Sequence, residues 1–115
     1  MKNITTKQFL KRLKKLYDEA LEVAKNKNAD YSGVDDPFKN FKIVEQLGIT
    51  SVEVGIMTRM SDKMSRIATL LNKKENVKEE SINDTLLDLS VYANILRIWL
   101  EENKNGKRKI TGKKV

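Results

Sequence analysis

The sequence predicts an all-α fold, similar to a four-helix bundle, in a single domain over residues 1–102 that is followed by a basic tail over 103–115. Three observations predict this fold. Apolar residues recur at helical spacing in four segments, most of these segments are bounded by residues that begin or end helices, and no stretch of any length alternates as a strand would. A chain of 115 residues has room for one domain and not for two.

The first helix is predicted over residues 6–27, and Thr5 or Thr6 supplies the side chain that caps its start. Residues of its apolar side recur every three or four positions: Leu10, Leu13, Tyr17, Ala20 and Ala24. Residues 28–36 have no such period and are rich in turn-forming residues, so they are predicted to form a loop.

A short second helix is predicted after this loop, from Pro37 to Leu47. Asp36 has the chemistry of an N-cap, and Pro37 suits the first position of a helix because proline has no N–H to donate. Gly48 is typical of the residue that ends a helix.

A third helix is predicted over residues 51–73, because Thr50 and Glu53 have the spacing of a capping box. Its apolar residues again follow helical spacing: Ile56, Met57, Met60, Met64, Ile67 and Leu71. We interpret the methionines as packing residues, and residues 72–78 as a polar connection.

The fourth helix is predicted from about residue 79 to residue 102 and is apolar on two sides. One side carries Ile82, Leu86, Leu89, Ala93, Leu96 and Leu100. The other carries Val91, Tyr92, Ile95, Ile98 and Trp99, and its N-terminal end is formed by Asp84 and Asp88. A helix with two apolar sides usually contacts neighbours, or a second subunit, on both of them.

The composition excludes several kinds of chemistry. The chain has no Cys and no His, so disulfides, thiolate zinc sites, imidazole ligands and Ser-His or Cys-His catalysis are impossible. Any reaction must use carboxylates, Lys, Tyr, Ser or Thr, or a hard cation with oxygen ligands. The start of the chain has no continuous apolar stretch, so we expect no signal peptide, no membrane span and a cytoplasmic location, in the host cell if a phage encodes the protein.

The net charge of +7 comes from the two ends of the chain. Six of the Lys and Arg residues lie in 1–17 and another six in 103–115, so residues 18–102 between them are net acidic. The tail has almost nothing to bury and is predicted to be mobile, with weak, nonspecific attraction to nucleic acid.

Asp84 and Asp88 carry the strongest functional signal. They lie one turn apart on an otherwise apolar side of the fourth helix, where like charges repel and burial is costly. Two groups could compensate them: a divalent cation, or a Lys or Arg from a facing helix.

The third helix supplies candidates of both kinds, since Arg59, Asp62, Lys63 and Arg66 share its polar face. If that face turns toward Asp84 and Asp88, the result is a site of three carboxylates and three cations, suited to a metal ion and a polyphosphate. If it turns outward, it is a solvated face with weak ion pairs. The sequence leaves both alternatives open.

Several candidate residues also have structural interpretations. Glu53 is better explained as a capping residue than as a ligand, and Asp84 could cap in the same way in a box that starts at Ser81. Glu19 and Glu22 form a Glu-x-x-Glu motif but lie on a lysine-rich side, so we interpret them as solvated. The aromatic residues Tyr31, Phe38, Phe41 and Trp99 could stack on a base, although aromatics at helical spacing more often belong to a core.

Four motifs give the chain a resemblance to a known family. They are Asn28-Ala29-Asp30-Tyr31-Ser32-Gly33, Asp36-Pro37-Phe38-Lys39-Asn40-Phe41, residues 57–66 (MTRMSDKMSR) and residues 80–93 (ESINDTLLDLSVYA). Their order and spacing over residues 25–100 resemble the phage and bacterial family called nucleotide modification associated domain, type 1. More distantly, the pattern resembles the MazG and dUTPase-like group of all-α nucleoside triphosphate pyrophosphohydrolases. Members of this group are helical oligomers that hydrolyse nucleotides to the monophosphate and pyrophosphate with magnesium.

The distant resemblance implies a site for metal and phosphate. The usual signature of that group is Glu-x-x-Glu on one helix and Glu-x-x-Asp on a later one, which here would be represented by Arg59 and Asp62 and by Asp84 and Asp88. The first pair therefore has an Arg in place of an acid, and the second pair is spaced by four residues instead of three.

The resemblance thus implies an enzyme that holds Mg²⁺, or Mn²⁺, through Asp62, Asp84 and Asp88. Arg59, Lys63 and Arg66 would neutralise the polyphosphate as catalytic residues, and a homo-oligomer is expected. Base and sugar would contact Tyr31, Asn40, Phe41 and Tyr92. Two alternatives stay open: a non-catalytic protein that binds or sequesters a nucleotide or nucleic acid on the same scaffold, and a purely structural helical dimer.

Overall fold

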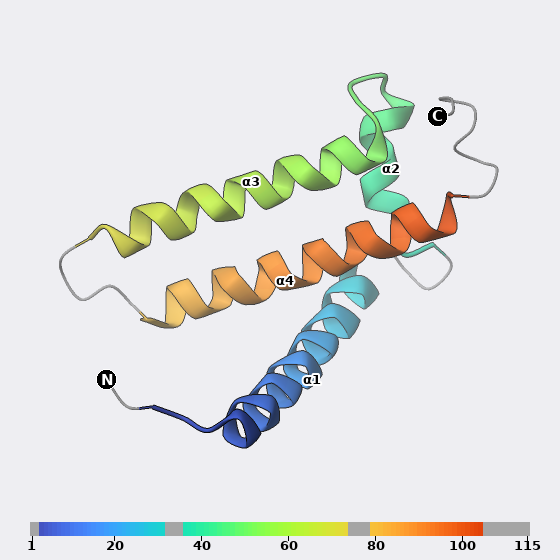
Figure 1. Ribbon diagram of the computed structural model, residues 1–115. Helices are drawn as coiled ribbons and strands as arrows, with labels where there is room; N and C mark the ends of the chain where they lie inside the picture. Colours follow the sequence, from blue (N-terminus) through green and yellow to red (C-terminus); the bar gives the residue numbers. More distant parts are fainter. Residues whose placement is uncertain (1–2, 32–35, 74–78, 105–115) are drawn as a thin grey trace. The chain divides into compact units, whose positions relative to one another are not determined.

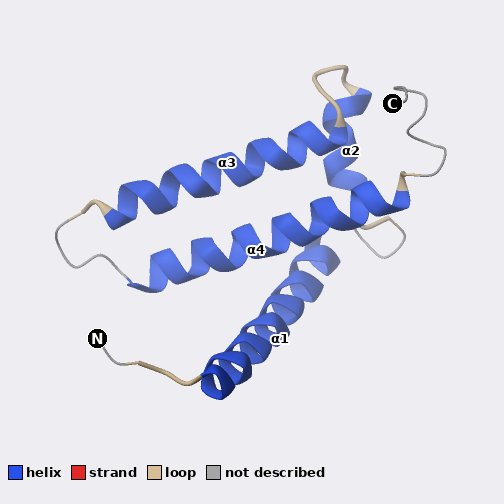
Figure 2. Cartoon of the chain, in the orientation of Figure 1, coloured by secondary structure: helices blue, strands red, loops and turns tan. Residues whose placement is uncertain are grey.

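The computed structural model describes residues 3–31, 36–73 and 79–104, which form helices joined by loops and turns (Figure 2). The helices are α1 (Thr6–Tyr31), α2 (Lys39–Gln46), α3 (Val52–Leu71) and α4 (Glu79–Glu102). No strand occurs in these ranges, which confirms the predicted all-α class. The chain divides into two compact units, Met1–Pro37 with α1 and Phe38–Val115 with α2, α3 and α4.

The start of α1 is capped as predicted. The Gln8 N–H donates to Thr5 Oγ1 at 3.1 Å, and the Thr5 N–H donates to Gln8 Oε1 at 2.9 Å, so the two residues form a reciprocal capping box. The helix continues to Tyr31, and the prediction of a loop from residue 28 was wrong for 28–31. The helix can continue through residues 28–31 because Asn and Asp disfavour a helix by only a few tenths of a kcal/mol each. The first residue that strongly disfavours a helix is Gly33, since the sequence has no Gly or Pro before it.

The start of α2 differs from the prediction. Its N-cap is Phe38, without a side-chain hydrogen bond, so the placement of Asp36 at the cap and Pro37 at the first helical position was wrong. The Phe38 ring lies edge-on to Trp99 with centroids 5.2 Å apart. This contact with α4 occurs at the residue where the helix begins, and local capping preferences take no account of it.

The end of α2 agrees with the prediction, because Gly48 adopts a φ of 75°. The Gly48 N–H donates to the Glu45 carbonyl at 3.0 Å and the Ile49 N–H donates to the Val44 carbonyl at 2.9 Å. These two bonds form a Schellman motif, which satisfies carbonyls that the helix leaves open.

The N-cap of α3 is Ser51, whose Oγ accepts from the Val54 N–H at 3.2 Å. The predicted capping box of Thr50 and Glu53 was therefore wrong by one residue. Glu53 instead accepts a hydrogen bond from the Trp99 indole, Nε1 to Oε1, at 3.0 Å. A polar contact between helices has replaced the expected local one.

The bounds of α4 match the predicted segment. Ser81 lies inside this helix, where its carbonyl accepts from Thr85 Oγ1 at 2.8 Å, so the alternative that Ser81 and Asp84 form a capping box was wrong. The predicted tail begins in a turn at residues 103–104, and residues 105–115 lie outside the described residues.

In the second unit, α3 and α4 run antiparallel side by side, and α2 lies against the N-terminal part of α3 (Figure 1). The buried core consists of Val52, Ile56 and Trp99. The partly buried residues around it are Phe38, Phe41, Met60, Ile95 and Leu96. The core therefore lies at one end of the α3–α4 pair, where residues of α2 also contribute.

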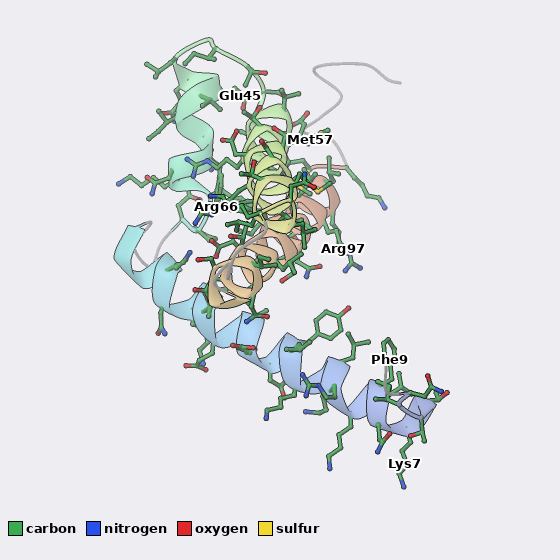
Figure 3. The ribbon with its side chains drawn as sticks, turned by 90° about the vertical axis from the view of Figure 1, so that its left-hand side faces the viewer. Lys7, Phe9, Glu45, Met57, Arg66 and Arg97 are labelled. Atoms are coloured by element: carbon green, nitrogen blue, oxygen red, sulfur yellow. The ribbon has the colours of Figure 1, made fainter. Side chains whose placement is uncertain are left out.

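One side of the α3–α4 pair is apolar and exposed, and we call it the apolar face: Met57, Met64 and Leu71 of α3 with Leu86 and Leu100 of α4. Counting about 100° per residue from the contacts between the helices places these residues on a common side. Figure 3 shows Met57 and Arg97 on this side and Arg66 on the opposite one, where α2 lies. No helix in the described ranges is long and apolar enough to cross a membrane.

Candidate functional site

The candidate site lies along the contact line between α3 and α4, beyond the core. Three cations follow one another along α3, and we call them the cation row: Arg59, Lys63 and Arg66. Each contacts a residue of α4: Arg59 with Tyr92, Lys63 with Asp88, and Arg66 with Thr85. The sequence left open whether this face of the third helix turns inward. In the structure Lys63 is partly buried against α4, while Arg59 and Arg66 are exposed and reach α4 with the ends of their side chains.

The central contact is an ion pair between Lys63 Nζ and Asp88 Oδ2 at 3.5 Å. The two side chains are 30% and 23% exposed, so the pair is partly shielded from water. The Lys63 ammonium also lies 5.9 Å from the centroid of the Tyr92 ring. Of the two compensations weighed for Asp88, the structure contains the lysine from the facing helix.

Arg59 joins the row to two aromatic side chains. Its guanidinium lies 5.6 Å from the centroid of the Phe41 ring, and its Nη1 lies 3.5 Å from the Tyr92 hydroxyl. Phe41 and Tyr92 contact each other edge-on with centroids 6.2 Å apart. Asn40 precedes Phe41 on α2 and is partly buried. The structure thus brings Phe41 and Tyr92, both expected to contact a ligand, beside the cation row.

Arg66 contacts a residue that sequence reasoning missed. Its Nε donates to Thr85 Oγ1 at 3.3 Å, and the Thr85 hydroxyl donates in turn to the Ser81 carbonyl. Thr85 is 5% exposed, which makes it a buried polar residue of the second unit. The sequence could have indicated Thr85, because it lies three residues before Asp88 and therefore on the same side of the helix.

The other two predicted acids are more open to solvent than Asp88. Asp62 and Asp84 are both exposed, and counting about 100° per residue places them on the same side of the pair as Arg59 and Arg66. Within the described ranges, no group of three His, Cys, Asp or Glu side chains is close enough to hold a metal ion. The structure therefore brings Asp88 to Lys63 and leaves Asp62 and Asp84 exposed, so the prediction that Asp84 lies inward beside Asp88 was wrong.

Two other predicted groups lie on α1. Tyr31 is the last residue of this helix instead of a loop residue, and its side chain lies outside the described residues. Glu19 and Glu22 are exposed, as predicted, and Glu22 pairs with Lys25 at 3.9 Å. A Glu-x-x-Glu motif at this position is a solvated helix face.

The chemistry of the site follows from its charges. The cation row offers three cations over about two turns of helix, since these positions rise about 6 and then 4.5 Å along the axis. Asp88 is in an ion pair with one of the three, and both Arg side chains donate to hydroxyl groups that carry no charge. Such a row suits an extended anion with several charges, and adjacent phosphates are such an anion.

Comparison of the chain with models of protein families, with curated proteins and with solved structures finds no match. The resemblance based on the four motifs thus stays a prediction, and the function is argued from the site.

Proposed function

We propose that the protein binds a nucleotide polyphosphate at the cation row and hydrolyses it with Mg²⁺, as a nucleoside triphosphate pyrophosphohydrolase. The observation that carries this proposal is the direction of the cation row, which meets Asp88 and Tyr92 of α4. Lys63 is 30% exposed and paired with a carboxylate of α4, which distinguishes it from a cation that only improves solubility.

The residues of the chain have separate roles in this proposal. Lys63, Arg59 and Arg66 bind the phosphates and neutralise the charge that develops as the bond to the leaving pyrophosphate breaks. Phe41 and Tyr92 offer aromatic surfaces next to these cations, where a base can stack, and Asn40 supplies an amide nearby. Tyr31, which was also expected to contact base or sugar, belongs to the first compact unit and has no role in this proposal.

Asp62, Asp84 and Asp88 would hold the metal ion. Their oxygen donors fit Mg²⁺ or Mn²⁺, and Mg²⁺ commonly uses one or two protein carboxylates while water and phosphates supply its other ligands. When bound, the ion polarises the phosphate and lowers the pKa of an attacking water. Since no three-acid group occurs in the described ranges, water and the phosphates would have to supply most of the ligands.

A panel of ribonucleoside and deoxyribonucleoside triphosphates, assayed with Mg²⁺ for release of pyrophosphate and phosphate, tests the proposal. We expect wild type to release pyrophosphate from at least one of them.

Asp88→Asn and Arg59→Met should each lower kcat/KM by about 100-fold, the usual cost of losing one electrostatic partner of the transition state. The exposed residues Glu101 and Lys73 provide matched controls, and Glu101→Gln and Lys73→Met should retain wild-type kcat/KM. Absence of turnover in wild type, or full activity in Asp88→Asn, would contradict the proposal.

The ion pair between Lys63 and Asp88 supports a second candidate, a non-catalytic protein that binds a nucleotide or nucleic acid. In this candidate the pair is a permanent structural contact, and Asp88 never binds a metal. A nucleotide should then raise the melting temperature of wild type without being hydrolysed. Thermal unfolding with and without Mg²⁺ and each nucleotide separates this candidate from the enzyme.

We also propose that the protein forms a homo-oligomer with a MazG-type helical bundle and acts in the cytoplasm, where nucleoside triphosphates occur. The apolar face supports the oligomer, since several large apolar side chains exposed on one side of a helix pair are typical of a contact site. On α1, further apolar side chains are exposed: Phe9, Leu10, Leu16, Tyr17 and Leu21.

A further inference from the structure

Tyr92 of α4 contacts two neighbouring cations of the row with different parts of its side chain. Its hydroxyl accepts a hydrogen bond from Arg59 Nη1 at 3.5 Å, and its ring centroid lies 5.9 Å from the Lys63 ammonium. Arg59 and Lys63 are four positions apart on α3, so their side chains leave the helix one above the other. Tyr92 therefore lies where it can determine how these two positive charges are placed relative to each other.

The side chain of Tyr92 is itself held in place. Its ring meets the Phe41 ring at 90° with centroids 6.2 Å apart, and Phe41 packs against the buried core. The Arg59 guanidinium lies 5.6 Å from the centroid of the same Phe41 ring. Arg59, Phe41 and Tyr92 thus contact one another in all three pairs, and each contact restricts the other two.

Asp88 and Tyr92 both contact Lys63. Asp88 pairs with its ammonium at 3.5 Å, and Tyr92 places its ring beside it. Arg59 meets α4 at Tyr92, four positions after Asp88. Loss of Asp88 would thus release Lys63, whereas loss of Tyr92 would release Arg59 and loosen Lys63.

We propose that Tyr92 is a positioning residue, which fixes the spacing of Arg59 and Lys63 and so makes the site selective for linked phosphates over a single phosphate. This inference rests on the proposed function, because the two cations are those that bind the polyphosphate in it. It adds a role for the Tyr92 hydroxyl, which base stacking by the ring does not need.

The selectivity follows from the cost of ordering two long side chains. Arg and Lys have many rotamers, and most of these would place the two charges badly for one ligand. Contacts that hold both charges before the ligand arrives remove much of this cost. Once one of several linked phosphates has bound, the next is already close to the second cation. A single phosphate gains less from the spacing of the two cations.

The test measures the binding of sodium tripolyphosphate and of sodium phosphate to the full chain by isothermal titration calorimetry, at equal ionic strength and with a chelator present. Neither ligand has a base, so stacking on Tyr92 cannot contribute. Tyr92→Phe keeps the ring and removes the hydroxyl that holds Arg59. We expect it to weaken tripolyphosphate binding by about tenfold, as the loss of one hydrogen bond to a charged group does, and to change phosphate binding by less than about twofold.

Two further variants complete the test. Tyr92→Leu also removes the ring and should reduce the preference for tripolyphosphate further, and Tyr92→Phe decides the question if Tyr92→Leu does not fold. Tyr17→Phe removes the same hydroxyl from an exposed tyrosine of α1 and should leave both affinities unchanged. Thermal unfolding shows whether each variant is folded. A wild type that binds tripolyphosphate no more tightly than phosphate, or an equal preference in wild type and Tyr92→Phe, would overturn the inference.

Nucleotide hydrolysis separates the failure of this inference from the failure of the proposed function. If the preference for tripolyphosphate falls in Tyr92→Phe and wild type hydrolyses no nucleotide, the proposed enzyme fails and the role of Tyr92 stands. If wild type hydrolyses a nucleotide and Tyr92→Phe keeps the preference, only the role of Tyr92 fails.

Discussion

Trp99 connects all three helices of the second unit through different parts of one side chain. It is 8% exposed, its ring meets Phe38 edge-on, and its indole N–H donates to the Glu53 carboxylate. The apolar ring supplies buried area, and the hydrogen bond satisfies the one polar atom that this burial would otherwise leave without a partner. Trp99 is the only tryptophan of the sequence, so its fluorescence reports on this contact.

Removal of the acceptor should destabilise this end of the α3–α4 pair. We expect Glu53→Ala to lower the free energy of unfolding by about 1.5–3 kcal/mol, because the bond involves a charged group and its loss leaves a buried indole N–H. Urea unfolding followed by Trp99 fluorescence measures the change. Glu101→Ala, an exposed residue of α4, is the control and should change stability by less than about 0.5 kcal/mol. Equal effects of the two substitutions would show that the hydrogen bond contributes nothing.

The approach of α2 to α3 depends on a glycine inside a helix. A Cβ built on Gly55 would lie 2.9 Å from Val44 Cγ2, closer than real Cβ contacts. Val44 is β-branched and short, so its methyl group cannot turn aside as the end of a long side chain would. The helix tolerates the lower helical propensity of glycine at this position because the glycine lets α2 pack closely.

Gly55→Ala should therefore destabilise the protein although alanine is the better helix former. We expect a loss of about 1–2 kcal/mol, since overpacking costs about 1–3 kcal/mol and the gain in propensity returns up to about 1 kcal/mol. In a Val44→Ala background the obstructing methyl is gone, and the same substitution should become neutral or stabilising. Chemical denaturation of the four proteins of this cycle measures the coupling. A destabilisation of equal size in both backgrounds would locate the strain elsewhere.

The helices differ in how well the sequence predicted their ends. The caps at Thr5 and Gly48 were predicted correctly because both use local interactions that lie within a few residues. The starts of α2 and α3 were placed wrongly, at Asp36 with Pro37 and at Thr50 with Glu53. At both starts a residue contacts Trp99 of α4: Phe38 does so through its ring and Glu53 through its carboxylate. Trp99 lies more than forty positions further along the chain, so a pattern of neighbouring residues cannot predict these contacts.

In the described part of the second unit, few apolar residues are buried and several are exposed. The buried apolar core consists of Val52, Ile56 and Trp99, whereas Met57, Met64 and Leu71 are 55%, 58% and 66% exposed. The interpretation of the methionines as packing residues is confirmed for Met60, which packs against the core, whereas Met57 and Met64 are exposed on the second unit. Burial of the apolar face in a homo-oligomer would supply the hydrophobic stabilisation that a small core lacks.

A charge on the apolar face should disrupt the proposed homo-oligomer. We expect wild type to sediment as a multimer at micromolar concentration and Met64→Asp to sediment as a smaller species, since burying an unpaired carboxylate is costly. Leu47→Asp is the matched control, because Leu47 is also apolar and exposed but lies in the turn after α2. Analytical ultracentrifugation measures both variants. A monomeric wild type would contradict the proposed assembly.

The basic tail makes a separate prediction about nucleic acid. Deletion of residues 103–115 removes six of the Lys and Arg residues, so retention on a nucleic-acid column should fall and become less sensitive to salt. Nucleotide hydrolysis should be unaffected, because the proposed site uses Asn40, Phe41 and residues within 59–66 and 84–92, and none of them lies in the tail. Equal retention of the full and shortened chains would show that the tail does not contribute.

Periodicity, composition and capping chemistry were enough to predict the all-α class, the approximate extent of the helices in the described ranges and the inward position of Asp88, but not the exposure of Asp84. These properties follow from interactions between residues a few positions apart. The sequence could not decide whether a lysine or a metal would neutralise Asp88, or which way the cation row would turn. Both depend on the rotation and register of α3 against α4, which are set by packing between residues more than twenty positions apart, and only the folded structure places Lys63 beside Asp88.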